Sequence, residues 1–164
     1  MELIMATQSS IVPLSASLLF LDFDGVLHPA GGEAQHFVNL PRLERLLREY
    51  PKVDLVISSA WQDGHTLEEL KGFFSEDVAA RIIGVTRSVD PDHEAESRYD
   101  QIAMYVRCLR HGPMAWVALD DAAHEFPDCC TQLVLCDSAR GFDDEAETRL
   151  RSALQLTAQN GGKA

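Results

Sequence analysis

Basic residues are scarce in this chain of 164 residues: 14 Lys and Arg stand against 26 Asp and Glu, which gives a formal net charge of −12. A surface with this balance repels phosphate backbones at long range, so nucleic acid is not expected as a default partner. The balance does not exclude a small phosphorylated molecule, because one bound cation can reverse the local charge of a site.

Paired cysteine motifs and long apolar segments are absent too. The four cysteines show no CxxC spacing, which argues against a zinc site and against a disulfide framework. The apolar stretch 11–21 has no basic residue before it and runs directly into Asp22, so it predicts a strand with an irregular lead-in rather than a signal peptide or a membrane span. We therefore expect a cytoplasmic protein with no membrane segment.

Internal repeats and low-complexity tracts are also lacking. The length fits a single domain, because one hydrophobic core is expected over roughly 100 to 200 residues. We expect this domain to cover residues 1–164, with 1–16 as an irregular lead-in and 157–164 as a disordered tail.

What the chain does contain is a regular alternation of apolar runs and helix-like segments. The expected strands cover residues 18–21, 53–59, 81–85, 115–119 and 132–136. Apolar residues at helical spacing predict helices over 40–50, after a capping box at Thr66 and Glu69, from about Arg98 to near Gly112, and after Gly141. The alternation predicts a three-layer, Rossmann-like α/β fold around a mainly parallel five-stranded sheet.

Polar residues follow three of these runs at the point where each ends. They are Asp22, Asp24 and Gly25 after the first run, Ser58 and Ser59 at the end of the second, and Asp120 and Asp121 after the fourth. The carboxyl ends of parallel strands share one edge of a sheet, so these side chains are expected to meet. Two unit charges 4 Å apart repel by roughly 4 kcal/mol at an effective dielectric of 20, so such a cluster needs a cation. Ligands that are all oxygen favour Mg²⁺ over zinc.

These residues together resemble a known enzyme family. Asp22-Phe-Asp24-Gly25 resembles the first motif of the haloacid dehalogenase (HAD) superfamily of phosphohydrolases, the serine after the second strand resembles its second motif, and Asp120-Asp121 resembles its fourth. The resemblance extends from about residue 18 to residue 136. It implies a sheet with the first strand at the centre, the second and fourth beside it, and the third and fifth outside them.

The resemblance also implies a mechanism and a metal. Asp22 is the expected nucleophile, which forms an aspartyl phosphate, and Asp24 is expected to protonate the leaving oxygen and later to activate water. Mg²⁺ would be held by Asp22, by the backbone carbonyl of Asp24 and by Asp120, with Asp121 bound directly or through water. The function implied is that of a Mg²⁺-dependent phosphatase acting on a phosphate monoester.

The same resemblance implies phosphate-binding residues. Ser58 would hydrogen-bond a phosphate oxygen, with Ser59 as the alternative, and Gly25 turns the chain sharply beside them. The third motif of the superfamily is a lysine, or less often an arginine, near the helix before the fourth strand. Arg98 is the candidate here, and Arg87 is its rival.

Two residues close to these motifs have no assigned role. His28 follows the first motif and Trp61 follows the serine pair, and either side chain could contact substrate or simply pack. The short segments 25–39 and 87–97 leave no room for a large cap domain, so the site is expected to be open. The expected substrate is a phosphorylated small molecule or an exposed phosphate on a macromolecule.

Two other functions remain open from the sequence. A receiver-like signalling module also groups acidic residues and Mg²⁺ at a sheet edge, but it expects a phosphorylated aspartate on a middle strand and a lysine after a late one. A catalytically silent domain would keep the phosphate pocket for a binding partner. The sequence does not set the oligomeric state.

Overall fold

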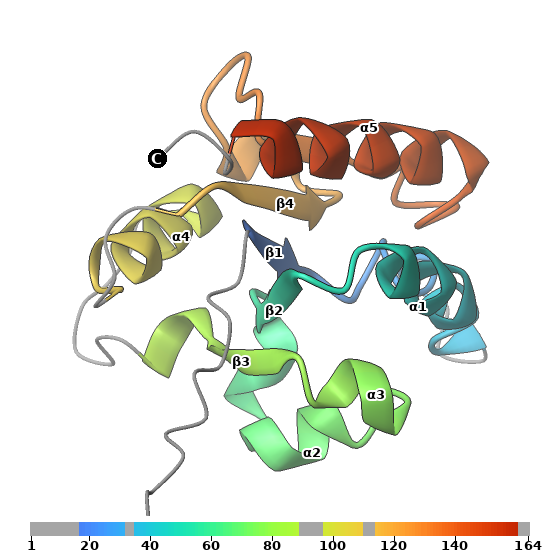
Figure 1. The fold of residues 1–164 in the computed structure, drawn as a ribbon. Helices are drawn as coiled ribbons and strands as arrows, with labels where there is room; N and C mark the ends of the chain where they lie inside the picture. Colours follow the sequence, from blue (N-terminus) through green and yellow to red (C-terminus); the bar gives the residue numbers. More distant parts are fainter. Residues whose placement is uncertain (1–16, 32–34, 89–96, 110–113, 161–164) are drawn as a thin grey trace, which may run out of the picture.

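The computed structural model describes residues 17–31, 35–88, 97–109 and 114–160. Its core is a five-stranded, wholly parallel sheet in the order β3-β2-β1-β4-β5, which confirms the expected arrangement with β1 at the centre (Figure 1). The strands are β1 (Ser17–Leu21), β2 (Val53–Ile57), β3 (Ile82–Val85), β4 (Trp116–Asp120) and β5 (Leu133–Leu135). The expected lead-in 1–16 lies outside the described residues.

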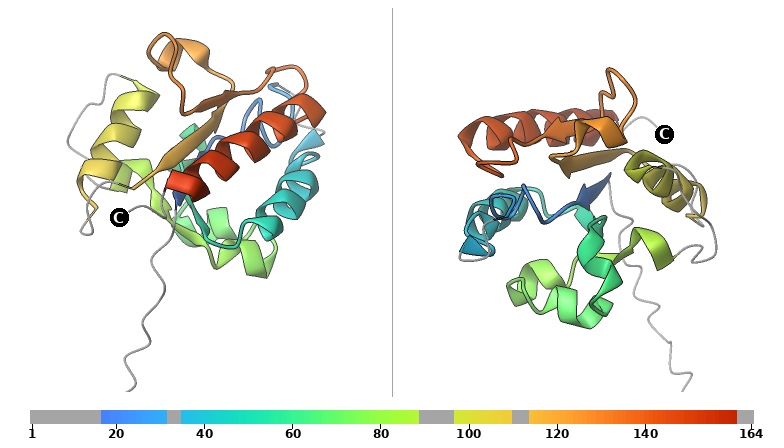
Figure 2. Two further views of the ribbon diagram at one scale, coloured as in Figure 1. Left: turned by 45° about the horizontal axis from the view of Figure 1, so that its top comes forward. Right: turned by 180° about the vertical axis from the view of Figure 1, so that it is seen from behind.

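Helices cover both faces of this sheet. The α-helices are α1 (Leu40–Glu49), α2 (Leu67–Lys71), α3 (Glu76–Ala79), α4 (Arg98–Arg107) and α5 (Asp144–Asn160), and short 3-10 turns form η2 (Ala60–Asp63), η3 (Thr86–Ser88) and η4 (Ala123–Glu125). Helices α1 and α5 lie on one side of the sheet and α4 on the other (Figure 2). This is the predicted three-layer α/β fold, and within the described ranges no cap domain is inserted.

The central strand β1 is buried on both faces, which explains its unbroken apolar sequence. Leu18 and Phe20 pack against α4, whereas Leu19 and Leu21 point to the opposite face and join the cluster formed by α1 and α5. Successive side chains of a strand point to opposite faces, so one strand supplies both halves of the core. A charged residue inside this run would be buried without a partner, and the first one, Asp22, comes where the strand ends.

Helices α2 and α4 both occur where the sequence predicts them, and α4 is shorter than expected. The capping box that begins α2 is present: the Thr66 hydroxyl accepts from the Glu69 N–H at 3.2 Å, and the Glu69 carboxylate accepts from the Thr66 N–H at 2.7 Å. Helix α4 begins at Arg98 as expected, but it ends at Arg107, earlier than the sequence predicts.

The expected disordered tail is wrong for residues 157–160, which continue helix α5 as far as Asn160. Leu150 and Leu154 are buried against the sheet, and the Thr157 hydroxyl donates to the Leu154 carbonyl at 2.9 Å. Extending a helix that already exists costs little, so the polar end of the chain follows the packed turns before it. Residues 161–164 lie outside the described ranges.

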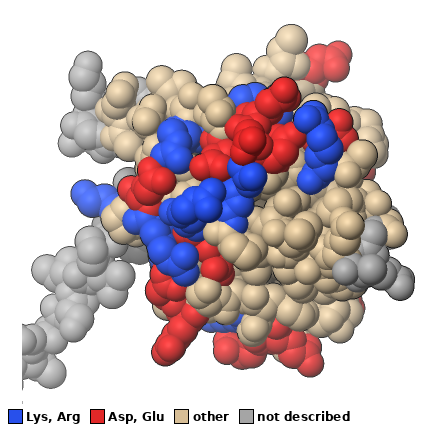
Figure 3. Space-filling model, turned by 90° about the vertical axis from the view of Figure 1, so that its right-hand side faces the viewer, with Lys and Arg blue, Asp and Glu red and all other residues tan. Residues whose placement is uncertain are grey.

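The surface formed by α1 and α5 carries basic and acidic side chains side by side (Figure 3). Arg42 pairs with Glu147 at 3.1 Å and also with Asp144, and Arg151 pairs with Glu147 at 3.2 Å and also with Glu49. Three of these four pairs bridge α1 and α5, whereas Arg151 and Glu147 both belong to α5. The arginines in these pairs are thus matched by carboxylates. No helix in the described ranges is long and apolar enough to cross a membrane, and the four cysteines, all described, form no disulfide.

The loop that follows Asp24 is held in place by contacts with distant segments. The Asn39 side-chain amide donates to the Val26 carbonyl at 3.2 Å and to the Arg140 carbonyl at 3.0 Å. Gly141 has a φ of +71°, and a Cβ at this position would lie 2.6 Å from the Val26 carbonyl oxygen. Only glycine allows the segment before α5 to approach the loop this closely.

Gly141→Ala is expected to lower the free energy of unfolding by about 2–4 kcal/mol, because it adds a clash with backbone to a left-handed conformation. Gly31→Ala is the matched control: its φ is +74°, but a Cβ there meets nothing within 4 Å, so the expected loss is about 1 kcal/mol. Urea denaturation measures both. Equal losses in the two variants would show that the close approach at Gly141 contributes nothing.

Candidate active site

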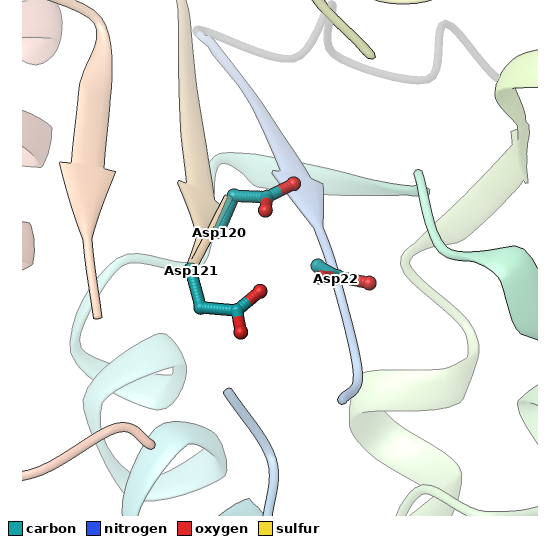
Figure 4. A group of neighbouring side chains, drawn as sticks. All are labelled: Asp22, Asp120 and Asp121. Carbon is teal, nitrogen blue, oxygen red and sulfur yellow. The ribbon is translucent and has the colours of Figure 1, made fainter. Parts of the chain in front are cut away.

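Three carboxylates meet at the carboxyl edge of the sheet. Asp22 directly follows β1, Asp120 ends β4, and Asp121 comes next along the chain. Strands β1 and β4 are neighbours, and the Asp22 N–H donates to the Leu119 carbonyl at 3.1 Å, so the two strand ends lie level. One oxygen from each of the three side chains lies within 4.8 Å of the others. Figure 4 shows Asp120 and Asp121 pointing toward the end of β1, where Asp22 lies.

The two carboxylates at the strand ends are strongly desolvated. Asp22 is 5% exposed and Asp120 is 1% exposed. Burial, followed by the negative charge of Asp120, raises the pKa of Asp22 to about 7, although Arg98, the Phe23 N–H and the Ser59 hydroxyl each act to lower it. The pKa of Asp120 is raised as well, again chiefly by burial. Burial and mutual repulsion therefore oppose full ionisation of the cluster.

Arg98 supplies the positive charge that faces this cluster. It is the first residue of α4, and one of its guanidinium nitrogens lies 3.1 Å from Asp120 and 3.4 Å from Asp22. Its backbone N–H donates to the Glu125 carboxylate at 2.8 Å, which ties the start of α4 to the turn after β4. The residue chosen from the sequence for the third motif thus contacts both the expected nucleophile and an expected metal ligand.

Arg87, the rival for this role, is paired elsewhere. Its guanidinium is half exposed and contacts Asp63 in η2. It does line a polar cavity of about 230 Å³ together with Ser59, Arg98 and Gln62, so it borders the space next to the carboxylates without touching them. The structure therefore brings Arg98, and not Arg87, to Asp22.

The two serines after β2 occupy different positions, although both are buried. The Ser58 N–H donates to the Leu21 carbonyl at 2.9 Å and so extends the pairing of β2 with β1. The Ser59 hydroxyl is hydrogen-bonded to Asp22, and Ser59 lines the polar cavity. Of the two candidates for a phosphate contact, Ser59 is the one beside the expected nucleophile, although the sequence analysis placed Ser58 first.

The Asp24 side chain lies outside the carboxylate cluster and is 55% exposed. One of its oxygens is 2.8 Å from His28 Nε2, and the other accepts a hydrogen bond from the Trp61 indole N–H at 3.0 Å. Sequence reasoning left His28 and Trp61 without a role. The only signal in the sequence is that each follows one of the polar strand ends by a few residues.

Gly25 makes room for Asp121. Its φ is +72°, and a Cβ there would lie 2.5 Å from Asp121 Cγ, with one carboxylate oxygen closer still. A side chain at position 25 would push Asp121 away from the other two carboxylates. Asp121 does not cap the following turn η4, whose N-cap is Ala122.

The donor set fits a divalent cation. Three carboxylates would carry three negative charges when ionised, and Arg98 offsets one of them, which leaves two to be neutralised in a desolvated position. All donors are oxygen atoms and no histidine or cysteine belongs to the group, which suits Mg²⁺ better than zinc. Asp22, Asp120 and Asp121 are the side chains that would hold the ion.

In the absence of metal, stability is expected to decrease with pH. Folding raises the pKa of Asp22 from 3.8 to about 7, so the folded state binds a proton that the unfolded chain releases. The free energy of unfolding should therefore fall between pH 4 and pH 7, by at most about 1.4 kcal/mol per pH unit from this group, and level off above it. Urea denaturation in EDTA measures the free energy of unfolding at each pH, and Asp22→Asn should make its dependence on pH flatter.

Mg²⁺ competes with that proton, so it is expected to raise the melting temperature more at pH 8 than at pH 5. If the pH profiles of the wild type and Asp22→Asn run parallel in EDTA, Asp22 does not carry the raised pKa. An equal Mg²⁺ shift at both pH values would mean that the ion binds elsewhere.

No curated protein and no solved structure matches the chain. A family model described as the HAD domain in Swiss Army Knife RNA repair proteins matches residues 18–146, from the start of β1 into α5. This range contains every carboxylate, serine and arginine of the candidate site. The chain therefore belongs to this family of the haloacid dehalogenase superfamily, and it has the fold of a hydrolase of that type.

Proposed function

We propose that this protein is a Mg²⁺-dependent phosphatase that hydrolyses a phosphate monoester through an aspartyl phosphate on Asp22. The observation that carries the proposal is the meeting of Asp22 with two further carboxylates, Arg98 and the Ser59 hydroxyl at one edge of the sheet. The nucleophile, the hydrogen-bond donors to the phosphate and the metal ligands thus come from segments far apart in the chain. A purely structural ion-pair network has no need of three acidic groups for one arginine.

The first half of the reaction uses the buried side of the site. Asp22 attacks the phosphorus atom, and a bond from its carboxylate oxygen to phosphorus forms while the bond to the leaving oxygen breaks. The Arg98 guanidinium and the Ser59 hydroxyl donate hydrogen bonds to phosphate oxygens from the polar cavity. When bound, Mg²⁺ would neutralise negative charge on the transferring phosphoryl group. Asp22, Asp120, Asp121 and the backbone carbonyl of Asp24 would hold it.

Both halves of the reaction also use the exposed side of the site, where Asp24 lies. In the first half, Asp24 gives its proton to the leaving oxygen. In the second half, it takes a proton from the water that attacks the aspartyl phosphate, so its carboxyl group returns to its protonated starting state. Its 55% exposure supports this role, because both the leaving group and the water must reach it. The departing phosphate carries away the oxygen that the water supplied, and Asp22 is regenerated.

The substrate we propose is a molecule that carries its phosphate at an exposed end. The absence of a cap domain from the described residues supports access for a large molecule, and the family name makes the terminal phosphate of an RNA the first macromolecular substrate to test. The net charge of −12 opposes contacts along a nucleic-acid backbone. Both facts are compatible if the site engages the terminal phosphate and few others.

Purified protein is expected to hydrolyse p-nitrophenyl phosphate with Mg²⁺ and to stop when EDTA is added. Asp22→Asn should lower kcat by about 10³-fold or more, because it removes the nucleophile. Asp128→Asn, an exposed aspartate outside the site, is the matched control and should keep wild-type turnover. Ordinary activity in a folded Asp22→Asn variant would refute the nucleophile. A wild type inactive on a broad panel of monoesters, with Mg²⁺ bound, would favour the catalytically silent binding domain.

For a short oligoribonucleotide with a terminal phosphate, we expect phosphate release with a weak salt dependence. Contact with one or two phosphates predicts a slope of log kcat/KM against log salt no steeper than about −1.4, since each single-strand contact contributes roughly −0.7. Phosphate release between 50 and 300 mM salt measures this. A much steeper slope would show that the enzyme tracks the RNA backbone.

A further inference from the structure

The exposed carboxylate of Asp24 is held by two nitrogen donors, one on each oxygen. Oδ1 lies 2.8 Å from His28 Nε2, and Oδ2 lies 3.0 Å from Trp61 Nε1. We propose that His28 and Trp61, the Asp24 donor pair, are positioning residues that fix the orientation of Asp24 for proton transfer to the leaving group. This inference rests on the proposed phosphatase function, in which Asp24 is the acid and base.

Both members of the donor pair carry a hydrogen toward Asp24. An indole nitrogen can only donate, so the direction of the Trp61 bond is settled by chemistry. For His28, the direction of the hydrogen bond to Asp24 follows from the contact that the other ring nitrogen makes. Its Nδ1 accepts from the Phe37 N–H at 3.3 Å, so in the neutral ring the proton sits on Nε2, which faces Asp24. His28 is 1% exposed, so contacts within the protein and not bulk water choose the tautomer.

The backbone at Phe37 supports the same orientation at a cost. Phe37 has a φ of +59°, a left-handed conformation that a bulky side chain rarely adopts. This conformation accompanies the hydrogen bond from its N–H to the His28 ring. Strain of this kind persists where the surroundings hold the residue in place, and it gathers at functional sites. Here it lies one hydrogen bond away from the His28 ring that orients Asp24.

Packing prevents the two donors from turning away. The Trp61 ring lies 5.6 Å from Phe23, 5.6 Å from Phe73 and 5.3 Å from His65, measured between centroids. The His28 ring lies 5.5 Å from Phe37 and 5.8 Å from Trp61. An exposed aspartate would otherwise sample several rotamers, whereas two rigid rings from different segments restrict it to one carboxylate plane.

The restriction matters because proton transfer needs a defined direction. Each carboxylate oxygen has two lone pairs, and the donor pair engages one on each oxygen, which leaves the others for the reacting proton. Well-placed acid and base groups contribute roughly 10²–10⁴-fold to rate, and this gain depends on their position. Loosening Asp24 should therefore weaken proton transfer while phosphate binding by Arg98 and Ser59 continues.

The test compares two substrates that differ in their need for a proton. Propyl phosphate must have its leaving oxygen protonated, whereas p-nitrophenyl phosphate releases a stable anion unaided. The parameter kcat/KM reports only steps up to release of the leaving group. Trp61→Phe keeps an aromatic ring in the same packing but lacks the N–H. It is expected to lower kcat/KM for propyl phosphate about tenfold or more and to leave that for p-nitrophenyl phosphate within about twofold.

A second signature separates this role from general damage. Water activation also uses Asp24, so kcat and KM for p-nitrophenyl phosphate should fall together in Trp61→Phe, and a burst of nitrophenolate should precede the steady state. His28→Phe is expected to behave in the same way. His28→Gln restores an N–H donor near the position of Nε2 and should recover most of the propyl phosphate activity.

Matched controls use rings that do not reach Asp24. Trp116→Phe changes the only other tryptophan, which packs on Phe20 on the α4 side of the sheet. His36→Gln changes an exposed imidazole whose ring is tilted against His28, with the centroids 4.8 Å apart. Neither control should change the ratio of kcat/KM between the two substrates.

The outcomes separate the two proposals. A wild type that hydrolyses neither substrate with Mg²⁺ would end the phosphatase proposal, and this inference with it. An active wild type with equal losses on both substrates in Trp61→Phe, or with no loss, would overturn the positioning role alone. Because Trp61 is only partly buried, this variant stays informative even if His28→Phe fails to fold.

Discussion

Mutual repulsion among three carboxylates at one sheet edge is the constraint on which the rest of the site depends. It arises from strand pairing: Leu21 and Leu119 lie opposite one another in the register of β1 and β4, so the next residues, Asp22 and Asp120, emerge side by side. Two neighbouring residues allow these carboxylates to lie together despite the repulsion. Arg98 at the start of α4 faces Asp22 and Asp120. Gly25 has no side chain, which leaves room for Asp121 beside them. The fold is thus arranged to keep like charges together, which is costly without a cation.

Much of the fold and the carboxylates of the site could be predicted from the sequence, because both follow from local patterns. A buried parallel strand reads as an unbroken apolar run, and its end is marked by the first polar residue, as at Leu21 and Asp22. Parallel strand order then brings such ends together without any knowledge of side-chain positions. The capping box at Thr66 and Glu69 is equally local, since both partners lie within one turn.

The remainder depends on geometry that no short pattern encodes. Whether Arg98 or Arg87 reaches Asp22 depends on where α4 begins relative to the sheet, and which serine faces Asp22 depends on how the chain turns after β2. The His28 ring of the Asp24 donor pair accepts a hydrogen bond from Phe37, whose backbone is left-handed, a conformation that sequence alone does not favour at a phenylalanine. The end of α5 was missed for a different reason, because its polar residues follow packed turns rather than a pattern of their own.

The contrast in burial between Asp22 and Asp24 has one further consequence. Asp22 is 5% exposed, whereas the Asp24 side chain, two residues on, is 55% exposed. In the proposed reaction, the residue that handles protons therefore touches bulk solvent directly. Asp24 can exchange its proton with water or buffer between turnovers, so the protein needs no internal chain of proton carriers. Turnover should therefore respond to buffer catalysts that reach this open side.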